Sequence, residues 1–180
     1  DGVLLRPLPF PESDRLVLLA TADSAGAPIP YLSEEVWLDW SERARTLESL
    51  ALYSFDRERW PFADDEGAFN VSGVRVTPDF FRVLRASMAA GRPFTAADGE
   101  LAVTVVSEGF WRSELGSAPL PIEVDLAGRP RFVVGVVRRG HEFPAGTEAY
   151  LPFVPERDGG EAYNWLNELG VGRLRPGVDL

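Results

Sequence analysis

Apolar residues recur along this chain in short runs or alternating sets, each ended by proline, glycine or acidic residues. Such spacing is typical of β-strands joined by turns. It predicts strands at 16–20, 47–55, 69–76, 101–106, 122–126, 131–137, 150–153 and 169–174. The first of these, Leu16–Ala20, is entirely apolar and therefore predicts a buried strand. Before it, Pro7, Pro9 and Pro11 fix φ and remove amide donors, which predicts an extended arm.

Three amphipathic segments predict short helices. Ser33, Thr77 and Ser107 each precede one of them, and a hydroxyl at that position can cap the first turn. The expected apolar faces are Val36, Trp37, Trp40 and Ala44 in the first helix, Phe80, Phe81 and Leu84 in the second, and Phe110, Trp111 and Leu115 in the third. We expect these faces to pack on the core.

The remaining segments predict turns and irregular structure. The apolar positions of 69–76 change parity at Gly73, which predicts a β-bulge. We expect an irregular segment at 60–62, a turn at 64–67 and a crossover loop at 86–99. Ala127-Gly128 lies between two alternating runs and predicts a tight hairpin turn. Short helices set among strands and hairpins indicate an α+β fold with mixed or antiparallel sheets.

Composition narrows the function classes. The chain has 180 residues, enough for one compact domain, and a net charge of −10, which on average repels nucleic acid and anionic lipid surfaces. It has no cysteine, so disulfides, thiolate nucleophiles and Cys-ligated metals are excluded. It also has no lysine, which excludes an ATP-binding P-loop. No stretch reaches the roughly 20 apolar residues of a membrane helix.

Candidate chemistry is sparse. His141 is the single histidine, and we expect it to be an exposed residue without a catalytic role. Asp64-Asp65-Glu66 lacks the spacing of a calcium loop and predicts a solvated turn.

Paired carboxylates with tryptophan platforms could suit sugar hydrolysis, but Trp37, Trp40 and Trp111 are expected to pack in the core. Trp60 and Trp165 stay open as platforms. We therefore assign no catalytic, cofactor-binding or metal residue.

A series of short motifs runs over nearly the whole chain, at 4–10, 14–17, 37–40 with 47–51, 73–84, 91–94 (Gly-Arg-Pro-Phe), 105–111, 128–130, 133–136 and 174–177. The order of these motifs resembles the MacB-like periplasmic core domain of bacterial ABC-transporter permeases (the MacB/FtsX class), and in particular its acidobacterial-type branch. Residues 115–120 are shorter than the family's usual segment, so partner contacts there are expected to differ.

The resemblance implies one core domain over 1–180 with two lobes. One lobe, similar to the porter subdomains of efflux pumps, would comprise 12–85 with 143–180, and a smaller α/β lobe, 86–142, would be inserted into it.

The implied role is non-catalytic: an extracytoplasmic domain between two transmembrane helices couples their motion to a periplasmic adaptor or substrate. The implied partners are the rest of the permease, a separate or fused ATPase and, in the full-length protein, a second permease copy; no cofactor is implied. The alternatives are a ligand-binding or sensing module of the permease and a secreted carbohydrate-active enzyme.

Overall fold

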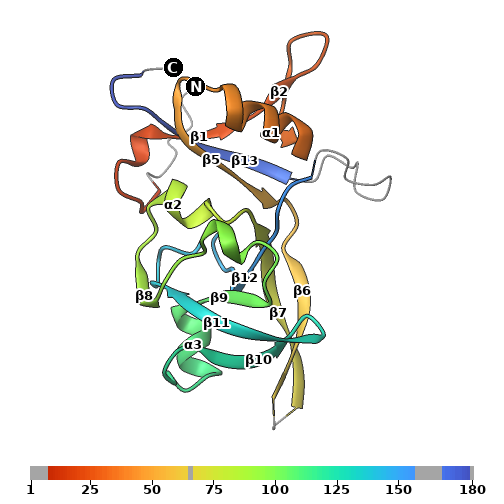
Figure 1. Cartoon of the computed structure of the whole chain (residues 1–180), viewed down its shortest axis with the longest axis vertical. Helices are drawn as coiled ribbons and strands as arrows, with labels where there is room; N and C mark the ends of the chain where they lie inside the picture. Colours follow the sequence, from red (N-terminus) through yellow and green to blue (C-terminus); the bar gives the residue numbers. More distant parts are fainter. Residues whose placement is uncertain (1–7, 65–66, 157–167, 179–180) are drawn as a thin grey trace.

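The computed structural model of the chain describes residues 8–64, 67–156 and 168–178. Its strands are β1 Leu16–Leu19, β2 Thr21–Ala22, β3 Pro28–Ile29, β4 Tyr31–Leu32, β5 Leu47–Ser54, β6 Glu58–Asp64, β7 Gly67–Val76, β8 Met88–Gly91, β9 Val103–Ser107, β10 Ile122–Leu126, β11 Arg129–Val137, β12 Ala149–Pro152 and β13 Glu168–Leu174. Its helices are α1 Glu34–Arg43, α2 Phe80–Leu84 and α3 Glu108–Ser113, with 3-10 turns at Ser13–Arg15 and Ala96–Asp98. The predicted α+β class is confirmed (Figure 1).

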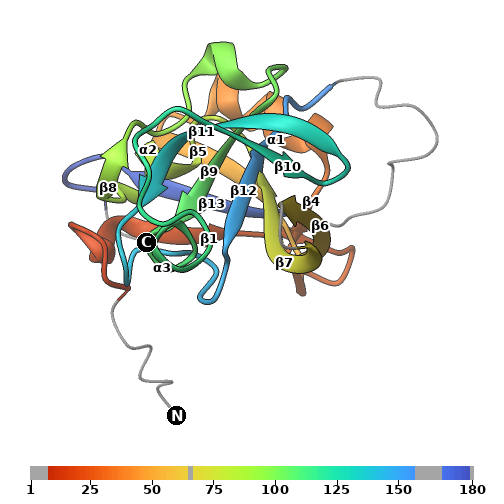
Figure 2. The ribbon, with the colours of Figure 1, turned by 90° about the horizontal axis from the view of Figure 1, so that it is seen from below.

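Eleven of the described strands form one mixed sheet in the order β1-β13-β5-β7-β12-β9-β11-β10-β6, with β4 beside β13 and β8 beside β11. Strand β6 also pairs with β7 along its whole length. The strands β7, β12, β9, β11, β10 and β6 therefore close into a ring, which can be followed in Figure 2. The remaining strands β5, β13, β1 and β4 extend from β7 as an open wing, which carries α1 and the ends of the described chain (Figure 1).

Inside the ring lies a cluster of buried side chains that comes from all six strands and α3. It comprises Trp60, Phe62, Val71, Val106, Phe110, Val124, Leu126, Val133, Val136, Ala149 and Leu151. Alternate residues of the same strands face the other way: Leu151 points into the ring, whereas Tyr150 belongs to a second cluster. A strand that is buried on both faces supplies two cores at once.

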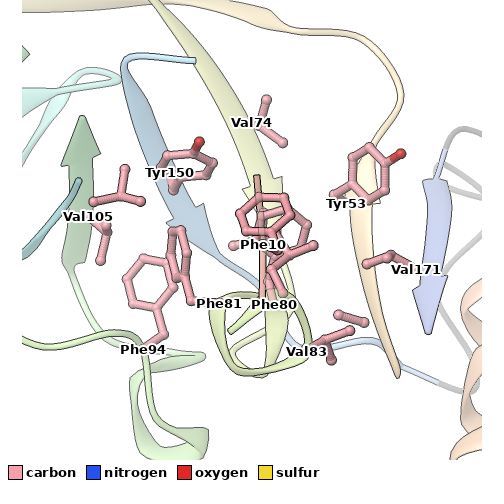
Figure 3. Packing of buried hydrophobic residues seen from close by; sticks show 14 of the residues in the cluster. Phe10, Tyr53, Val74, Phe80, Phe81, Val83, Phe94, Val105, Tyr150 and Val171 are labelled. Carbon is pink, nitrogen blue, oxygen red and sulfur yellow. The ribbon is translucent and has the colours of Figure 1, made fainter. Parts of the chain in front are cut away.

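The second cluster lies between the ring, the wing and α2 (Figure 3). All of Phe80, Phe81, Val83 and Leu84 in α2 are buried, which confirms the apolar face expected of this helix. Phe81 contacts the Tyr150 ring edge-on, with 5.0 Å between centroids. Because this cluster includes residues from β5, β7, β9, β12 and β13, α2 ties the ring to the wing.

Two of the three predicted caps are confirmed. The Ser33 hydroxyl accepts from Val36 N, and the Ser107 hydroxyl accepts from Phe110 N at 3.1 Å. The prediction that Thr77 caps a helix is wrong. Its hydroxyl accepts a hydrogen bond from Leu52 N on β5, and its own N–H donates to Leu52 O. Thr77 thus continues the pairing of β7 with β5 beyond the end of the strand.

Several strand predictions need correction. The run 16–20 gives β1, but this strand lies at the edge of the sheet and none of its residues is fully buried; Leu18 is 70% exposed. Residues 60–62 are not irregular but lie in β6, and the expected loop 86–99 contains β8. No bulge interrupts β7 at Gly73: the pairing with β6 ends at this residue, the pairing with β12 begins at it, and neither pairing has a register shift. The parity changes because β7 passes from the ring cluster to the second cluster.

Gly73 itself is required by the ring core. A Cβ at this position would lie 2.0 Å from the ring of Trp60, which is buried directly over it. The tight hairpin turn is confirmed: Ala127 and Gly128 both have positive φ, 56° and 73°, and join β10 to β11. This pair of angles is that of a type I′ turn.

Candidate interaction site at the chain ends

The residues singled out for chemistry do not come together. The described residues contain no group of three or more histidine, cysteine or acidic side chains that could hold a metal ion. His141 is half-buried rather than exposed, because its Nδ1 accepts from Ser87 N at 3.1 Å and its ring lies edge-on to Phe10. Asp64 Oδ1 accepts from Gly67 N at 3.0 Å, as in a hairpin turn; Asp65 and Glu66 lie outside the described residues.

The tryptophans provide no sugar platform among the described residues. Trp60 is 6% exposed and its Nε1 donates to Glu58 at 2.9 Å, so its ring face is covered. Trp165 lies outside the described residues. Trp37, Trp40 and Trp111 are only half-buried, contrary to the expected core positions. Helix α1 has no fully buried residue, because it packs on the wing only over a small cluster of Leu47, Leu50 and Leu174.

The most unusual buried group is Arg173 on β13, which is 0% exposed. Its guanidinium donates to three carbonyls: Val83 O at 2.8 Å, Leu84 O at 3.3 Å and Glu12 O at 3.0 Å. The first two lie at the C-terminal end of α2, where the helix dipole favours a cation. Burial lowers the pKa of Arg173. Among the described residues no carboxylate forms an ion pair with Arg173, and its hydrogen bonds go to carbonyl oxygens. The nearby charges of Glu12 and Glu48 favour its charged form, whereas those of Arg85 and Arg15 oppose it.

A surface network of ion pairs lies beside Arg173. Arg15 pairs with Glu12 and Glu48, and Arg85 pairs with the same two carboxylates. Arg15 also donates through Nε to Leu174 O at 2.9 Å. The hydrogen bond from Arg15 lowers the pKa of Glu12. The segment before β1, the start of β5, the end of α2 and the end of β13 are therefore joined at one point.

A second buried charge fixes the connection between β8 and β9. Asp98 is 1% exposed, accepts from both terminal nitrogens of Arg92 and accepts from Thr95 N at 2.7 Å. The hydrogen-bonded guanidinium of Arg92 lowers the pKa of Asp98 to about 2. Phe94, from the same Gly-Arg-Pro-Phe motif, is buried in the second cluster. The Gly-Arg-Pro-Phe motif thus holds the connection between β8 and β9 on the core.

Glu168, at the start of β13, is another buried charge. Burial raises the pKa of Glu168, and its ion pair with Arg75 is long, at 3.6 Å. Arg75 also binds Glu58 at 3.1 Å and lies over the ring of Phe153. Nothing in this arrangement places a nucleophile beside a base.

None of the helices in the part of the chain that the structure describes has the length and hydropathy needed to cross a bilayer. The sequence model of the MacB-like periplasmic core domain matches residues 2–180. None of the curated proteins compared with the chain matches it.

Solved structures show the same fold. A domain described as that of a permease protein from Porphyromonas gingivalis has a TM-score of 0.70 at 18% identity, with 94% of this chain and 79% of that chain covered. The periplasmic region of MacB from Actinobacillus actinomycetemcomitans has a TM-score of 0.64 at 15% identity, with 91% and 76% covered. The extracellular domain of the noncanonic ABC-type transporter YknZ from Gram-positive bacteria has a TM-score of 0.60 at 15% identity, with 89% and 83% covered. With the family match over almost its entire length, the chain belongs to the MacB-like periplasmic core domains.

Proposed function

We propose that this chain acts without catalysis, as the extracytoplasmic domain of an ABC-transporter permease, and that it passes motion of the membrane helices to a periplasmic partner or substrate. A domain with this role must be stiff, and its attachment points must be held firmly to its core. An ATPase would supply the motion, since the chain lacks the lysine of a P-loop.

The observation that carries the proposal is the Arg173 junction. The guanidinium joins the segment leading into β1, the last strand β13 and the helix α2 that ties wing to ring. A pull on either end of the chain is therefore transmitted to α2 and the second cluster rather than absorbed in a loop. The surface pairs of Arg15 and Arg85 strengthen the same junction.

We also propose the division into lobes, with 12–85 and 143–180 as one and 86–142 as the other. Strands β8 to β11 and α3 all come from 86–142. The two stretches meet through the pairings of β12 with β9 and of β10 with β6. The two lobes share one closed ring, so we expect them to move together as one rigid domain. A permease with two copies would then contain two such rigid domains.

The experiment uses the full permease with its ATPase, with spin labels on Cys replacing the exposed Phe55 and Phe132. The domain has no native cysteine, so these are its only labels. We expect ATP to change the label distances between two copies and to leave the Phe55–Phe132 distance within one copy unchanged. Arg173→Met should abolish the change between copies, whereas the matched control Arg129→Met should retain it. Distances that ignore nucleotide in the native protein would refute the coupling role.

The two alternatives have less support. A closed pocket between the lobes would favour a ligand-binding module, whereas three surface hollows lined by described residues lie on the wing beside α1. A carbohydrate-active enzyme would need two facing carboxylates and a tryptophan on the cleft wall, and Trp60 is buried. The gene gives a further test: without membrane helices encoded on both sides of this chain, the permease role fails.

A further inference from the structure

Three adjoining hollows surround the C-terminal end of α1. They measure ≈ 700, ≈ 490 and ≈ 370 Å³, and Ala44 contributes to all three. Leu47 lines the second and third, and Arg175 lines the first and third. They therefore form one continuous depression on the wing, which we call the α1 basin.

One side of the α1 basin is cationic. The first hollow is lined by Arg43, Arg45 and Arg175 against one acid, Glu42. The third hollow adds two acids, but Asp79 pairs with Arg82, and Glu48 pairs with Arg15 and Arg85. Arg43 is 75% exposed and pairs with Asp39 at 3.3 Å. Its position in the last turn of α1 also complements the helix dipole, but Arg45 and Arg175 lie outside the helix and need another explanation.

The other side of the α1 basin is apolar. Val17, Leu18 and Leu19 of β1 and the half-buried Trp40 line the second hollow, which also includes Arg43. Trp37 lines the third hollow, and its Nε1 has no hydrogen-bond partner among the described residues. Leu18, at 70% exposed, is the most exposed large apolar side chain described. Exposed leucine and tryptophan beside arginine are typical of surfaces that lie in a membrane interface.

The α1 basin lies where the described chain ends. Arg175 follows β13 directly, and its N–H donates to Thr46 O beside the basin. The last described segment therefore leaves the fold at the rim of this surface (Figure 1). A chain held by that end has the basin on its attached side.

We propose that the α1 basin docks on the bilayer and binds anionic phospholipid headgroups. Arg43, Arg45 and Arg175 contact the phosphates, while Leu18 and Trp40 enter the headgroup region. Charge complementarity selects a lipid surface over an apolar peptide added to the edge of β1, because such a peptide would not use the arginines. The proposal goes beyond the coupling role, and its test needs no permease.

The test is co-sedimentation of the 180-residue chain with vesicles of phosphatidylcholine alone or mixed with phosphatidylglycerol. We expect binding to the mixed vesicles alone, and weaker binding at higher salt. The triple variant Arg43→Gln, Arg45→Gln, Arg175→Gln should bind about fivefold more weakly per arginine removed. The control replaces three exposed arginines elsewhere, Arg59, Arg129 and Arg138, with glutamine and should bind like the native chain.

Each contrary outcome overturns the proposal. Equal binding by the two triple variants would show that the α1 basin is not the contact. Equal binding to neutral vesicles would remove the role of the arginines. A chain that binds inorganic phosphate but neither vesicle would have a small-anion site instead. A chain that forms a dimer lost in Leu18→Gln, without binding vesicles, would use the edge of β1 for a second copy. Thermal unfolding of each variant verifies that it is folded.

Discussion

Replacing Asp98 with asparagine tests how the loop between β8 and β9 is held. In the folded chain the pKa of Asp98 is lowered from 3.8 to about 2, chiefly by the hydrogen bonds from Arg92. A shift of this size corresponds to about 2 kcal/mol, after allowance for the half-exposed guanidinium of Arg92. We expect Asp98→Asn to lower the free energy of unfolding by that amount at neutral pH, which is roughly 4–8 °C in melting temperature.

The pH dependence distinguishes this mechanism from a general packing defect. Because the folded pKa lies below the unfolded one, the stabilisation is complete above pH 3.8 and is lost as the pH falls towards 2. Urea denaturation of the native chain and of Asp98→Asn between neutral and acidic pH should therefore give curves that converge in acid. Asp125→Asn, on the exposed face of β10, is the matched control. A deficit in Asp98→Asn that is constant across this range would refute the reasoning.

Three further substitutions test the core, a cap and a buried charge. Gly73→Ala should destabilise the chain by ~1–3 kcal/mol and alter tryptophan fluorescence, because the new Cβ would overlap the buried Trp60. An unchanged melting temperature would contradict the close contact between Gly73 and Trp60 in the ring core. Ser107→Ala should cost ~1 kcal/mol in urea denaturation through the lost bond to Phe110 N, and Ser107→Asp should restore it. Glu168→Gln should raise the melting temperature at neutral pH but not in acid, because burial raises the pKa of Glu168 and disfavours its charged form. A lower melting temperature at neutral pH would show that the ion pair with Arg75 dominates.

The strands and caps that the sequence predicted share a local cause. The hairpin of β10 and β11 follows from alternation on both sides of Ala127-Gly128, and Ser33 and Ser107 cap helices because the donors they need lie three residues away. Prediction from the local sequence failed where the partners of a strand come from distant parts of the chain. Residues 60–62 were expected to be irregular, yet Pro61 lies in β6. Its carbonyl accepts from Ala127 N on the side away from β7, so the N–H that proline lacks removes no bond to β7.

The candidate site could not be predicted from sequence. Arg173 binds carbonyls of Glu12, Val83 and Leu84, which are 89 to 161 residues away and carry no signal in their side chains. A carbonyl acceptor is present at every position, so only the fold selects these three. The α1 basin was missed for a related reason: its arginines come from α1, the following loop and the chain after β13. The family resemblance supplied the fold and general role, but not these contacts.

Arginine at position 173 breaks the pattern of its own strand, and that is informative. Val171, two residues earlier on the same face of β13, is buried in the second cluster, so an apolar residue would be expected at 173 as well. An apolar side chain there would avoid burying a charge, but it would leave three carbonyls without this donor. Only a planar guanidinium presents several donors in fixed directions to acceptors on different segments, whereas an ammonium is a single point. Arg173 therefore holds the entering segment, α2 and β13 in one geometry, as the proposed coupling role requires.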